Sequence, residues 1–398
     1  MISGTEGHDD ARWMRRACEL AGRSTGYTNP NPLVGCVIVR DGHVIGEGWH
    51  ERYGEAHAEV NALAACARSG ENPAGATVYV TLEPCAHQGK QPPCADALVQ
   101  ARVARVVIGS RDPNPLVAGK GAARLEAAGI TVERDVLRAA CDALNPVFFH
   151  YITTKRPYVV AKWAMTADGR IACASGDSRW VSGPASREDV HRLRHRLAAI
   201  VVGAGTVAAD DPALTCRLGD IPVNQPVRVV CDSRLAIAED SQLVRTVGEA
   251  PLLVACGEEA PVTAKAARLR ARGVEVVSLP GADGRVDVRA LVELLGARGI
   301  DSLLLEGGAR LQASFWEAGL VNEAVAYVAP KVVGGAGAPG PVAGTGVAAM
   351  GEAIRLGEPH VTLLGSDVRM VWPVGVDGAA RVACGAPGSL AADEGAGE

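Results

Sequence analysis

The first 150 residues alternate between short apolar runs and amphipathic stretches, the pattern expected of strands and helices in turn. Residues 31–50 predict two strands joined by a turn at Asp41 and Gly42, after a helical stretch at 10–24. An apolar stripe at helical spacing predicts a helix over 57–68. Strands and helices then alternate in the predicted segments 76–84, 94–101, 105–115, 121–129 and 130–136. The order β-β-α-β-α-β-α-β indicates an α/β sandwich.

A second series of apolar runs begins near residue 157. Strands are predicted within 157–171, 199–212, 226–234, 251–257, 274–280 and 301–315, several of them feeding helices. Between the two series, residues 141–159 predict the end of one domain and a linker. We therefore expect two α/β domains at 1–150 and 156–375, followed by a Gly/Ala-rich, disordered tail at 376–398.

Composition narrows the classes of function. A formal net charge of −5 over 398 residues, without a Lys/Arg block, argues against a dedicated nucleic-acid surface. The N-terminus has acidic residues and no apolar core, so no signal peptide is predicted, and no apolar run reaches membrane-spanning length. Eleven cysteines, scattered without a framework, suit a reducing cytoplasm.

The strongest chemical signal is GEAHAEV at 54–60 followed by TLEPCAHQGKQPPCADA at 81–97. It follows the H-x-E…P-C-x-x-C signature of zinc deaminases, but eight residues rather than two separate the cysteines. His57, Cys85 and Cys94 would supply three zinc ligands and leave the fourth position to water. Each cysteine is expected in the first turn of a helix, where the helix dipole stabilises a thiolate. Glu59 would carry the proton.

The spacing of this motif leaves alternatives. Residues i and i+2 of a regular helix point in nearly opposite directions, so His57 and Glu59 converge only at a helix start. A closed zinc knuckle or a set of buried cysteines would also contain these residues. We favour the catalytic interpretation, because the motif pieces come in the right order and no fourth ligand stands out. His87 is the nearest rival ligand, and we interpret it as a substrate contact.

The eight-residue gap, AHQGKQPP, contains a glycine and two prolines. It can form a loop that lets both sulfurs reach one metal and that covers a small substrate. Lys90 could then meet a phosphate, although an ordinary solvated loop lysine is an equal alternative.

The second domain carries weaker signals. GAGTVA at 203–208 matches G-x-G-x-x-A after a strand, which alone is weak evidence for a dinucleotide site. Asp232 would favour NAD in such a unit, whereas the neighbouring Ser233 and Arg234 would suit a 2′-phosphate. EGGARLQASF at 306–315 is a better anion site, since two glycines lead into a helix start. Turn glycines at strand–helix joints are the structural alternative for both.

Taken together, these segments resemble the bifunctional deaminase/reductases of riboflavin biosynthesis. PNPLVG, HAEV, TLEPCAHQGKQPPCADAL and DPNP are similar to the deaminase half. KWAMTADGRIA, SGDSRWVS, VGAGTVAADDPALTCR, CDS and LLLEGG are similar to the reductase half, and the match runs in order from about residue 10 to 375. The longer cysteine gap belongs to that family. The resemblance implies a cytidine-deaminase-like α/β/α sandwich with zinc, followed by a dihydrofolate-reductase-like α/β domain that uses NADPH.

The resemblance also implies roles for individual residues. His57, Cys85 and Cys94 would hold one zinc ion, and Glu59 would be the acid/base. The deaminase pocket would be lined by Asn31, His50, His87, Lys90, Asp112 and Asn114. NADPH would face Ala164, Trp180, Thr206, Asp210, Ser233, Gly308, Ala309, Arg310, Leu311, Gln312, Ala313 and Ser314. The reductase substrate would face Lys162, Ser178, Arg194, Leu214, Arg217 and Glu306.

Two reactions are implied. Zinc hydroxide would deaminate 2,5-diamino-6-(5-phosphoribosylamino)pyrimidin-4-one, and an NADPH hydride would then reduce the ribosyl group to a ribityl phosphate. We expect phosphorylated pyrimidines as ligands, no nucleic acid, no membrane, and a homo-oligomer of two or four chains in the cytoplasm. The alternative is a nucleic-acid or nucleoside deaminase fused to a nucleotide-binding domain.

Overall fold

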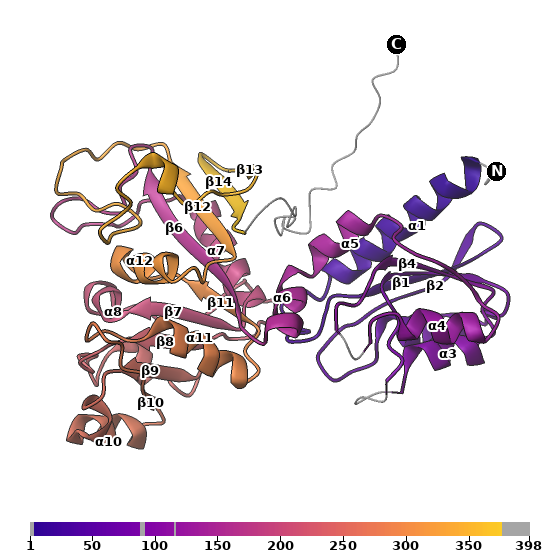
Figure 1. The fold of residues 1–398 in the computed structure, drawn as a ribbon, viewed down its shortest axis with the longest axis horizontal. Coiled ribbons are helices and arrows are strands. Elements are labelled where there is room, and N and C mark those ends of the chain that lie inside the picture. The colour runs from indigo at the N-terminus through magenta and orange to yellow at the C-terminus, as the bar shows by residue number, and fades with distance from the viewer. Residues whose placement is uncertain (1–3, 88–91, 115–116, 376–398) are drawn as a thin grey trace, which may run out of the picture. The chain divides into compact units, whose positions relative to one another are not determined.

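The computed structural model describes residues 4–87, 92–114 and 117–375 (Figure 1). Its chain divides into two compact units, the first ending at Thr153 and the second beginning at Thr154. The predicted disordered tail at 376–398 lies outside the described residues. No helix in the described ranges has the length and apolar character needed to cross a membrane.

The first unit is built on a five-stranded sheet in the order β2-β1-β3-β4-β5. β1 is antiparallel to β2 and β3, whereas β3, β4 and β5 are parallel. The strands are β1 (Gly35–Arg40), β2 (His43–Trp49), β3 (Thr77–Leu82), β4 (Arg105–Ser110) and β5 (Thr131–Glu133). The helices are α1 (Gly4–Gly22), α2 (Ala58–Arg68), α3 (Cys94–Gln100), α4 (Lys120–Ala127), α5 (Arg138–Leu144) and α6 (Pro146–Thr154).

Helices cover both faces of this sheet. Successive strand residues point to opposite faces, so Val78 and Val80 of β3 pack on one side and Tyr79 on the other. The face of Val78 is covered by buried residues of α2, α3 and α4, and the face of Tyr79 by buried residues of α1 and α5. The unit is therefore a three-layer α/β/α sandwich.

A tight turn and a close approach fix the helix that carries the zinc motif. The β1–β2 turn has positive φ at Asp41 (52°) and Gly42 (75°), the backbone of a tight hairpin. β2 then passes so close to α2 that a Cβ on Gly48 would lie 2.3 Å from the Ala62 nitrogen. Only glycine fits at that distance, which places the start of α2 beside the end of β2.

The segment at 141–159 differs from the prediction. It was predicted as a domain end and linker, but most of it is helical, in α5 and α6. Pro146 is the first residue of α6, a position where its missing N–H has no helical partner to lose. Asn145 joins the two helices and is buried. Its side-chain amide is satisfied there, since it accepts from the Leu33 N–H at 2.8 Å and donates to the Leu33 carbonyl at 2.9 Å.

The second unit contains a nine-stranded sheet in the order β10-β9-β8-β7-β11-β6-β12-β14-β13. The first seven strands of this order are parallel, and β14 and β13 are antiparallel to their neighbours. The strands are β6 (Tyr158–Thr166), β7 (Ala199–Gly203), β8 (Val227–Cys231), β9 (Leu252–Cys256), β10 (Glu275–Ser278), β11 (Ser302–Leu305), β12 (Glu323–Ala329), β13 (His360–Leu364) and β14 (Asp367–Pro373). Six of these were anticipated; β12, β13 and β14 were not.

Helices pack on this parallel sheet, and α11 and α12 lie in front of it in Figure 1. Leu291 and Leu295 of α11 and Phe315 of α12 join one apolar cluster with residues of β6, β7 and β11. The helices are α7 (Pro184–Arg196), α8 (Ala204–Asp210), α9 (Gln242–Arg245), α10 (Ala264–Ala271), α11 (Val288–Ala297) and α12 (Ala309–Glu317), with short 3₁₀ turns at Ala260–Val262 and Met350–Glu352. Both units are α/β, as predicted.

Candidate active sites

The three predicted zinc ligands come together in the first unit. The possible ligand atoms of His57, Cys85 and Cys94 all lie within 4.8 Å of one another. The His57 Nδ1 atom is 3.7 Å from the Cys85 sulfur and 3.3 Å from the Cys94 sulfur. Two thiols and one imidazole suit a tetrahedral zinc ion whose fourth position is left to water. The chemistry of this donor set therefore fits zinc.

The N-terminal end of α3 lies next to both cysteine sulfurs. Cys94 is the first residue of α3, as expected, but no helix begins at Cys85, so the prediction of a second helix start there is wrong. Instead the Cys94 N–H donates to the Cys85 sulfur at 3.3 Å, and the Ala95 N–H donates to the Cys85 carbonyl at 3.1 Å. A side-chain hydrogen bond from Cys94, followed by His57 and the Cys94 N–H, lowers the pKa of the Cys85 thiol and so favours the thiolate that binds metal.

His57 and Glu59 converge because His57 precedes the helix. His57 is the N-cap of α2 with extended backbone angles (φ −76°, ψ 166°), so the i, i+2 geometry of a regular helix does not apply. Glu59 lies one residue into α2 with 3% of its surface exposed. Burial, and then the nearby Cys85, raise the pKa of Glu59 to about 7. A carboxyl group with such a pKa can both accept and release a proton near neutral pH.

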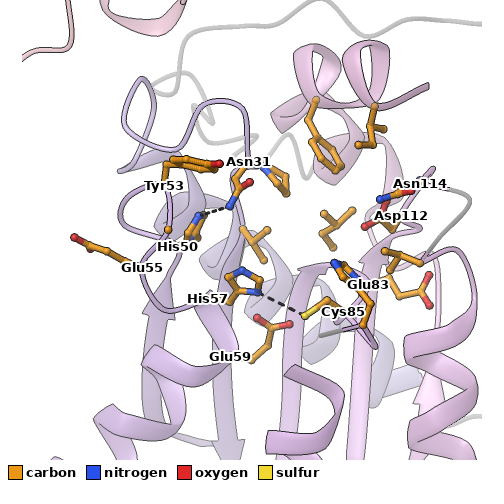
Figure 2. Close-up of a pocket in the computed structure, with 18 residues that line it drawn as sticks. Asn31, His50, Tyr53, Glu55, His57, Glu59, Glu83, Cys85, Asp112 and Asn114 are labelled. Atoms are coloured by element: carbon orange, nitrogen blue, oxygen red, sulfur yellow. Dashed lines mark hydrogen bonds between the residues drawn. The ribbon is translucent and has the colours of Figure 1, made fainter. Parts of the chain in front are cut away.

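A cavity of about 280 Å³ opens beside the zinc ligands (Figure 2). Its wall includes His57, Glu59 and Cys85 together with five of the six predicted pocket residues, namely Asn31, His50, His87, Asp112 and Asn114. The sixth, Lys90, lies outside the described residues. The volume and the mixture of apolar walls with a few polar groups suit a small, partly polar ligand.

A hydrogen-bonded pair orients the polar groups on one side of this cavity. The His50 Nδ1 atom lies 3.1 Å from the Ala56 carbonyl, which can only accept, so Nδ1 carries the hydrogen of the neutral ring. Burial lowers the pKa of His50 and so favours that neutral form. Its Nε2 atom then accepts from the Asn31 amide nitrogen at 3.2 Å (Figure 2). Asn31 is thereby fixed with its Oδ1 atom as the remaining acceptor.

Acidic groups lie on the other side. Burial raises the pKa of Asp112 to about 6, although its carboxylate accepts from the Asn114 N–H at 2.8 Å. Glu83, which we did not single out from the sequence, also lines the cavity. Its carboxylate accepts from the N–H groups of Gly119, Gly121 and Ala122 at 3.0 to 3.2 Å, so it holds the start of α4. Its place in the TLEPC motif was the available signal.

Further wall residues were missed, among them two pairs from neighbouring elements. Tyr53 and Glu55 come from the loop between β2 and α2, and Phe148 and Ile152 come from α6. The last two escaped notice because residues 141–159 were interpreted as a linker. Their apolar side chains, four residues apart along a helix, were the signal that could have identified them.

The second unit brings three of the predicted substrate residues into one ionic cluster. Lys162 of β6 donates from Nζ to Glu306 Oε1 at 3.1 Å. Arg194 of α7 donates from Nε and Nη2 to Glu306 Oε2 at 3.1 and 2.9 Å. The three side chains are 12 to 16% exposed. Burial alone would raise the pKa of Glu306, but Arg194 and Lys162 outweigh it and lower that pKa to about 2.

Thr215 joins two arginines at the same site. Its carbonyl accepts from Arg194 Nη1 at 3.1 Å, and its hydroxyl accepts from Arg217 Nη1 at 2.6 Å. The preceding residue, Leu214, is buried and has a left-handed backbone (φ 52°). In the loop after α8, Leu214 and Arg217 thus flank Thr215 in the sequence, and Thr215 is held by both arginines.

The predicted cofactor residues gather mainly at the ends of two parallel strands. Gly203 and Gly308 are the N-caps of α8 and α12, which follow β7 and β11, and neither end has a side-chain cap. The Gly308 N–H donates to the Thr206 hydroxyl at 3.1 Å, which joins the two helix starts. A Cβ on Gly307 would lie 2.8 Å from the Leu311 side chain. Adjacent helix starts approached by bare backbone suit a phosphate group, and therefore a nucleotide cofactor.

The other members of the predicted cofactor set have different environments. Arg179 links the loop of Ser178 and Trp180 to α8, since its Nη2 atom donates to the Asp210 carbonyl at 2.9 Å. Trp180 is 63% exposed and its ring lies 4.7 Å from the Arg187 guanidinium. Ala164 belongs to β6. The segment from Gly308 to Ser314 is not uniform: Ala309, Arg310, Leu311 and Ser314 are at least partly exposed, whereas Gln312 and Ala313 are buried.

Gln312 has a definite partner in the protein. Its amide nitrogen donates to the backbone carbonyls of Lys162 and Leu305 at 3.0 and 3.2 Å, and none of its surface is exposed. The side chain therefore ties α12 to β6 and β11 rather than facing solvent.

Asp232 argues against the classical dinucleotide arrangement. It is 2% exposed, and its carboxylate accepts from the Ile237 N–H at 2.7 Å, inside its own loop. The neighbouring Ser233 and Arg234 are half-buried and exposed respectively. Asp232 is thus occupied by the backbone, which removes the basis for assigning it to a ribose hydroxyl.

The comparisons with known proteins cover both units. The family model "Cytidine and deoxycytidylate deaminase zinc-binding region" matches residues 8–110, and "RibD C-terminal domain" matches residues 157–370. The riboflavin biosynthesis protein RibD of Actinobacillus pleuropneumoniae is 48% identical over 365 residues, which are 92% of this chain and 95% of that protein.

Two solved structures agree with that match. RibD of Acinetobacter baumannii, form 1, has a TM-score of 0.82 at 37% identity over 93% of this chain and 100% of that one. A Thermotoga maritima protein has a TM-score of 0.82 at 34% identity with the same coverage. It is described as a diaminohydroxyphosphoribosylaminopyrimidine deaminase/5-amino-6-(5-phosphoribosylamino)uracil reductase. The predicted fold and family are confirmed, and the chain belongs to the RibD family of bifunctional deaminase/reductases in riboflavin biosynthesis.

Proposed function

We propose that the first unit deaminates 2,5-diamino-6-(5-phosphoribosylamino)pyrimidin-4-one and that the second reduces the product with NADPH to the ribityl phosphate. The domains predicted at 1–150 and 156–375 would then carry one activity each. The observation that carries this proposal is the cavity in which His57, Cys85 and Glu59 meet Asn31. It joins a zinc donor set and a proton carrier to a polar group fixed for recognition.

In the deaminase step the protein residues divide into binding and proton transfer. His57, Cys85 and Cys94 would hold a zinc ion, which when bound would supply a water of lowered pKa as the nucleophile. Glu59, which lines the same cavity, would take up a proton from the attacking water and release one to the departing amino nitrogen. Asn31, fixed by His50, offers its Oδ1 atom to a donor on the pyrimidine.

In the reductase step NADPH supplies the hydride. The joined starts of α8 and α12 would receive its phosphate groups through their backbone N–H groups. Ser233 would meet the 2′-phosphate, since the neighbouring Asp232 carboxylate is already bound to its own loop and is not offered to a ribose hydroxyl. Lys162, Arg194 and Glu306 fix the polar part of the substrate, and Arg217 meets the substrate phosphate, which guanidinium binds in a bidentate manner.

The alternative, a nucleic-acid or nucleoside deaminase fused to a nucleotide-binding domain, is not favoured. The similarity to RibD proteins extends over both units, and the net charge is negative. We further propose that the chain acts on phosphorylated pyrimidines as a dimer or tetramer in the cytoplasm.

The test is to supply the purified chain with the diaminopyrimidinone phosphate. We expect release of ammonia, and then oxidation of NADPH that depends on the deaminated product. A zinc-loaded chain that releases no ammonia from this substrate, but releases it from cytidine or single-stranded DNA, would overturn the proposal.

A further inference from the structure

Lys162 lies over an aromatic ring that neither the motifs nor the proposed function accounts for. Its Nζ atom is 5.6 Å from the ring centroid of Tyr327, which is completely buried in β12 beside β6. An ammonium group within about 6 Å of an aromatic face is attracted by the ring quadrupole, more strongly where water is excluded. The Lys162 side chain is only 12% exposed, so most of the surrounding water is excluded.

The ring itself is fixed by a buried ion pair. The Tyr327 hydroxyl donates to Asp189 Oδ2 at 2.6 Å, and Arg369 Nε lies 2.9 Å from the same oxygen. Arg369 is also the register partner of Tyr327 across the β12–β14 ladder. The Asp189 and Arg369 side chains are 8% and 5% exposed, so this contact is sheltered from solvent.

Asp189 links Tyr327 to the helix that carries Arg194. It belongs to α7, five residues before Arg194, whose guanidinium binds the far oxygen of Glu306. Tyr327 is therefore held to the helix that carries one cation of the site, while its ring supports the other cation. Lysine has a long, flexible side chain, and a supporting face beneath it restricts where the ammonium can lie.

We propose that Tyr327 is a positioning residue for the reductase reaction, with its ring holding the Lys162 ammonium toward Glu306 and the Asp189 contact fixing the ring. The inference rests on the proposed reductase function, in which Lys162 meets the substrate. It assigns the ring, rather than the hydroxyl alone, the effect on turnover.

The test compares Tyr327→Leu, which removes the ring, with Tyr327→Phe, which keeps it and loses the hydroxyl. Tyr158→Leu is the matched control, because Tyr158 is a buried tyrosine of β6 whose hydroxyl lies 3.3 Å from Glu323. In the full-length zinc-loaded chain we expect Tyr327→Leu to lower the reductase kcat about tenfold. Tyr327→Phe should recover most of that loss, and Tyr158→Leu should keep kcat. NADPH affinity and ammonia release should not change in either Tyr327 variant.

A combined variant separates positioning from a general loss of structure. If Tyr327 acts through Lys162, replacing Tyr327 by Leu in a Lys162→Met chain should not lower the residual reductase rate further. Equal rates for Tyr327→Leu and the original chain, or equal losses in the Leu and Phe variants, would overturn the proposal. If Tyr327→Leu does not fold, Tyr327→Met is compared with Tyr327→Phe by the same criteria. Failure of the original chain to oxidise NADPH would instead reject the proposed reductase function.

Discussion

Each unit has a glutamate at its candidate reactive centre, buried in the case of Glu59 and partly buried in the case of Glu306, and the two glutamates have opposite electrostatic environments. Burial, and the sulfur of Cys85, raise the pKa of Glu59 to about 7. Glu306 is similarly withdrawn from water, but Arg194 and Lys162 contact both of its oxygens and lower its pKa to about 2. The same side chain can thus be protonated near neutral pH in one unit and is anionic at neutral pH in the other.

The difference teaches which role each glutamate can have. A group with a pKa near the working pH can accept and release a proton within one turnover, which deamination requires. A carboxylate with a pKa near 2 does not take up a proton at neutral pH, and so it serves as a fixed anion that holds two cations. Residue type alone does not distinguish these roles; the partners within hydrogen-bonding distance do.

Removal of the metal should have the largest effect on the difference between the two units, because it should stop the reaction of the first unit alone. Stripping the chain with a chelator, or replacing His57 by Ala, should abolish deamination because the donor set of three residues supplies the nucleophile's metal. Reduction of the supplied deaminated intermediate should continue. Elemental analysis together with both assays checks this, and a chain that deaminates at full rate without zinc would contradict it.

Glu59→Gln should have the next largest effect. The amide keeps the shape of the side chain but cannot carry a proton, so the deamination rate should fall by about 10²- to 10⁴-fold. Zinc content and the reductase rate should be unchanged, because the ligands and the second unit are intact. A parallel loss of reductase activity in a folded, zinc-loaded variant would argue for one shared site.

Glu306 predicts an acid dependence of stability. Its folded-state pKa lies below the ordinary value of 4.5, so its contribution is fully present above that value and is lost as the pH falls toward about 2. Glu306→Gln should therefore lower the free energy of unfolding at neutral pH by on the order of 3 kcal/mol. The measurement is denaturant unfolding of the original chain and of Glu306→Gln, monitored through the loss of NADPH binding, at several pH values between neutrality and about 3. It gives the difference between their free energies of unfolding at each pH. A difference that grows on acidification would contradict the assignment.

Cofactor choice should show the smallest effect. A charge-assisted contact from Ser233 to a 2′-phosphate corresponds to about one to two decades in affinity. We expect NADPH to be preferred over NADH by at least about tenfold in catalytic efficiency, and we expect Ser233→Ala to narrow that preference. Steady-state rates with both cofactors provide the test, and equal efficiencies in the unmodified chain would reject this placement.

The sequence predicted the elements whose signals are local. The zinc ligands follow a short motif, and the hairpin at Asp41 and Gly42 follows turn chemistry. It did not predict β12 to β14, nor that the segment after Cys141 folds back as the wall of a cavity. Such features depend on which distant segments meet. Glu83 illustrates the limit, because its partners lie 36 to 39 residues further along the chain.

The ionic cluster of the second unit shows the same limit. Lys162, Arg194 and Glu306 come from three separate elements, and family resemblance rather than spacing placed them in one site. That Tyr327 lies beneath Lys162 follows from the pairing of β12 with β6, which no local pattern announces.

Helix α6 sets where this chain could be divided into two independent proteins. Phe148 and Ile152 form part of the deaminase cavity wall, and only Lys155, Arg156 and Pro157 separate the end of α6 from β6, which carries Lys162. A cut placed before α6 would remove part of that wall, and a cut placed after Tyr158 would shorten a strand at the centre of the second sheet. A cut that spares both the cavity wall and the strand must therefore fall within the three residues between α6 and β6.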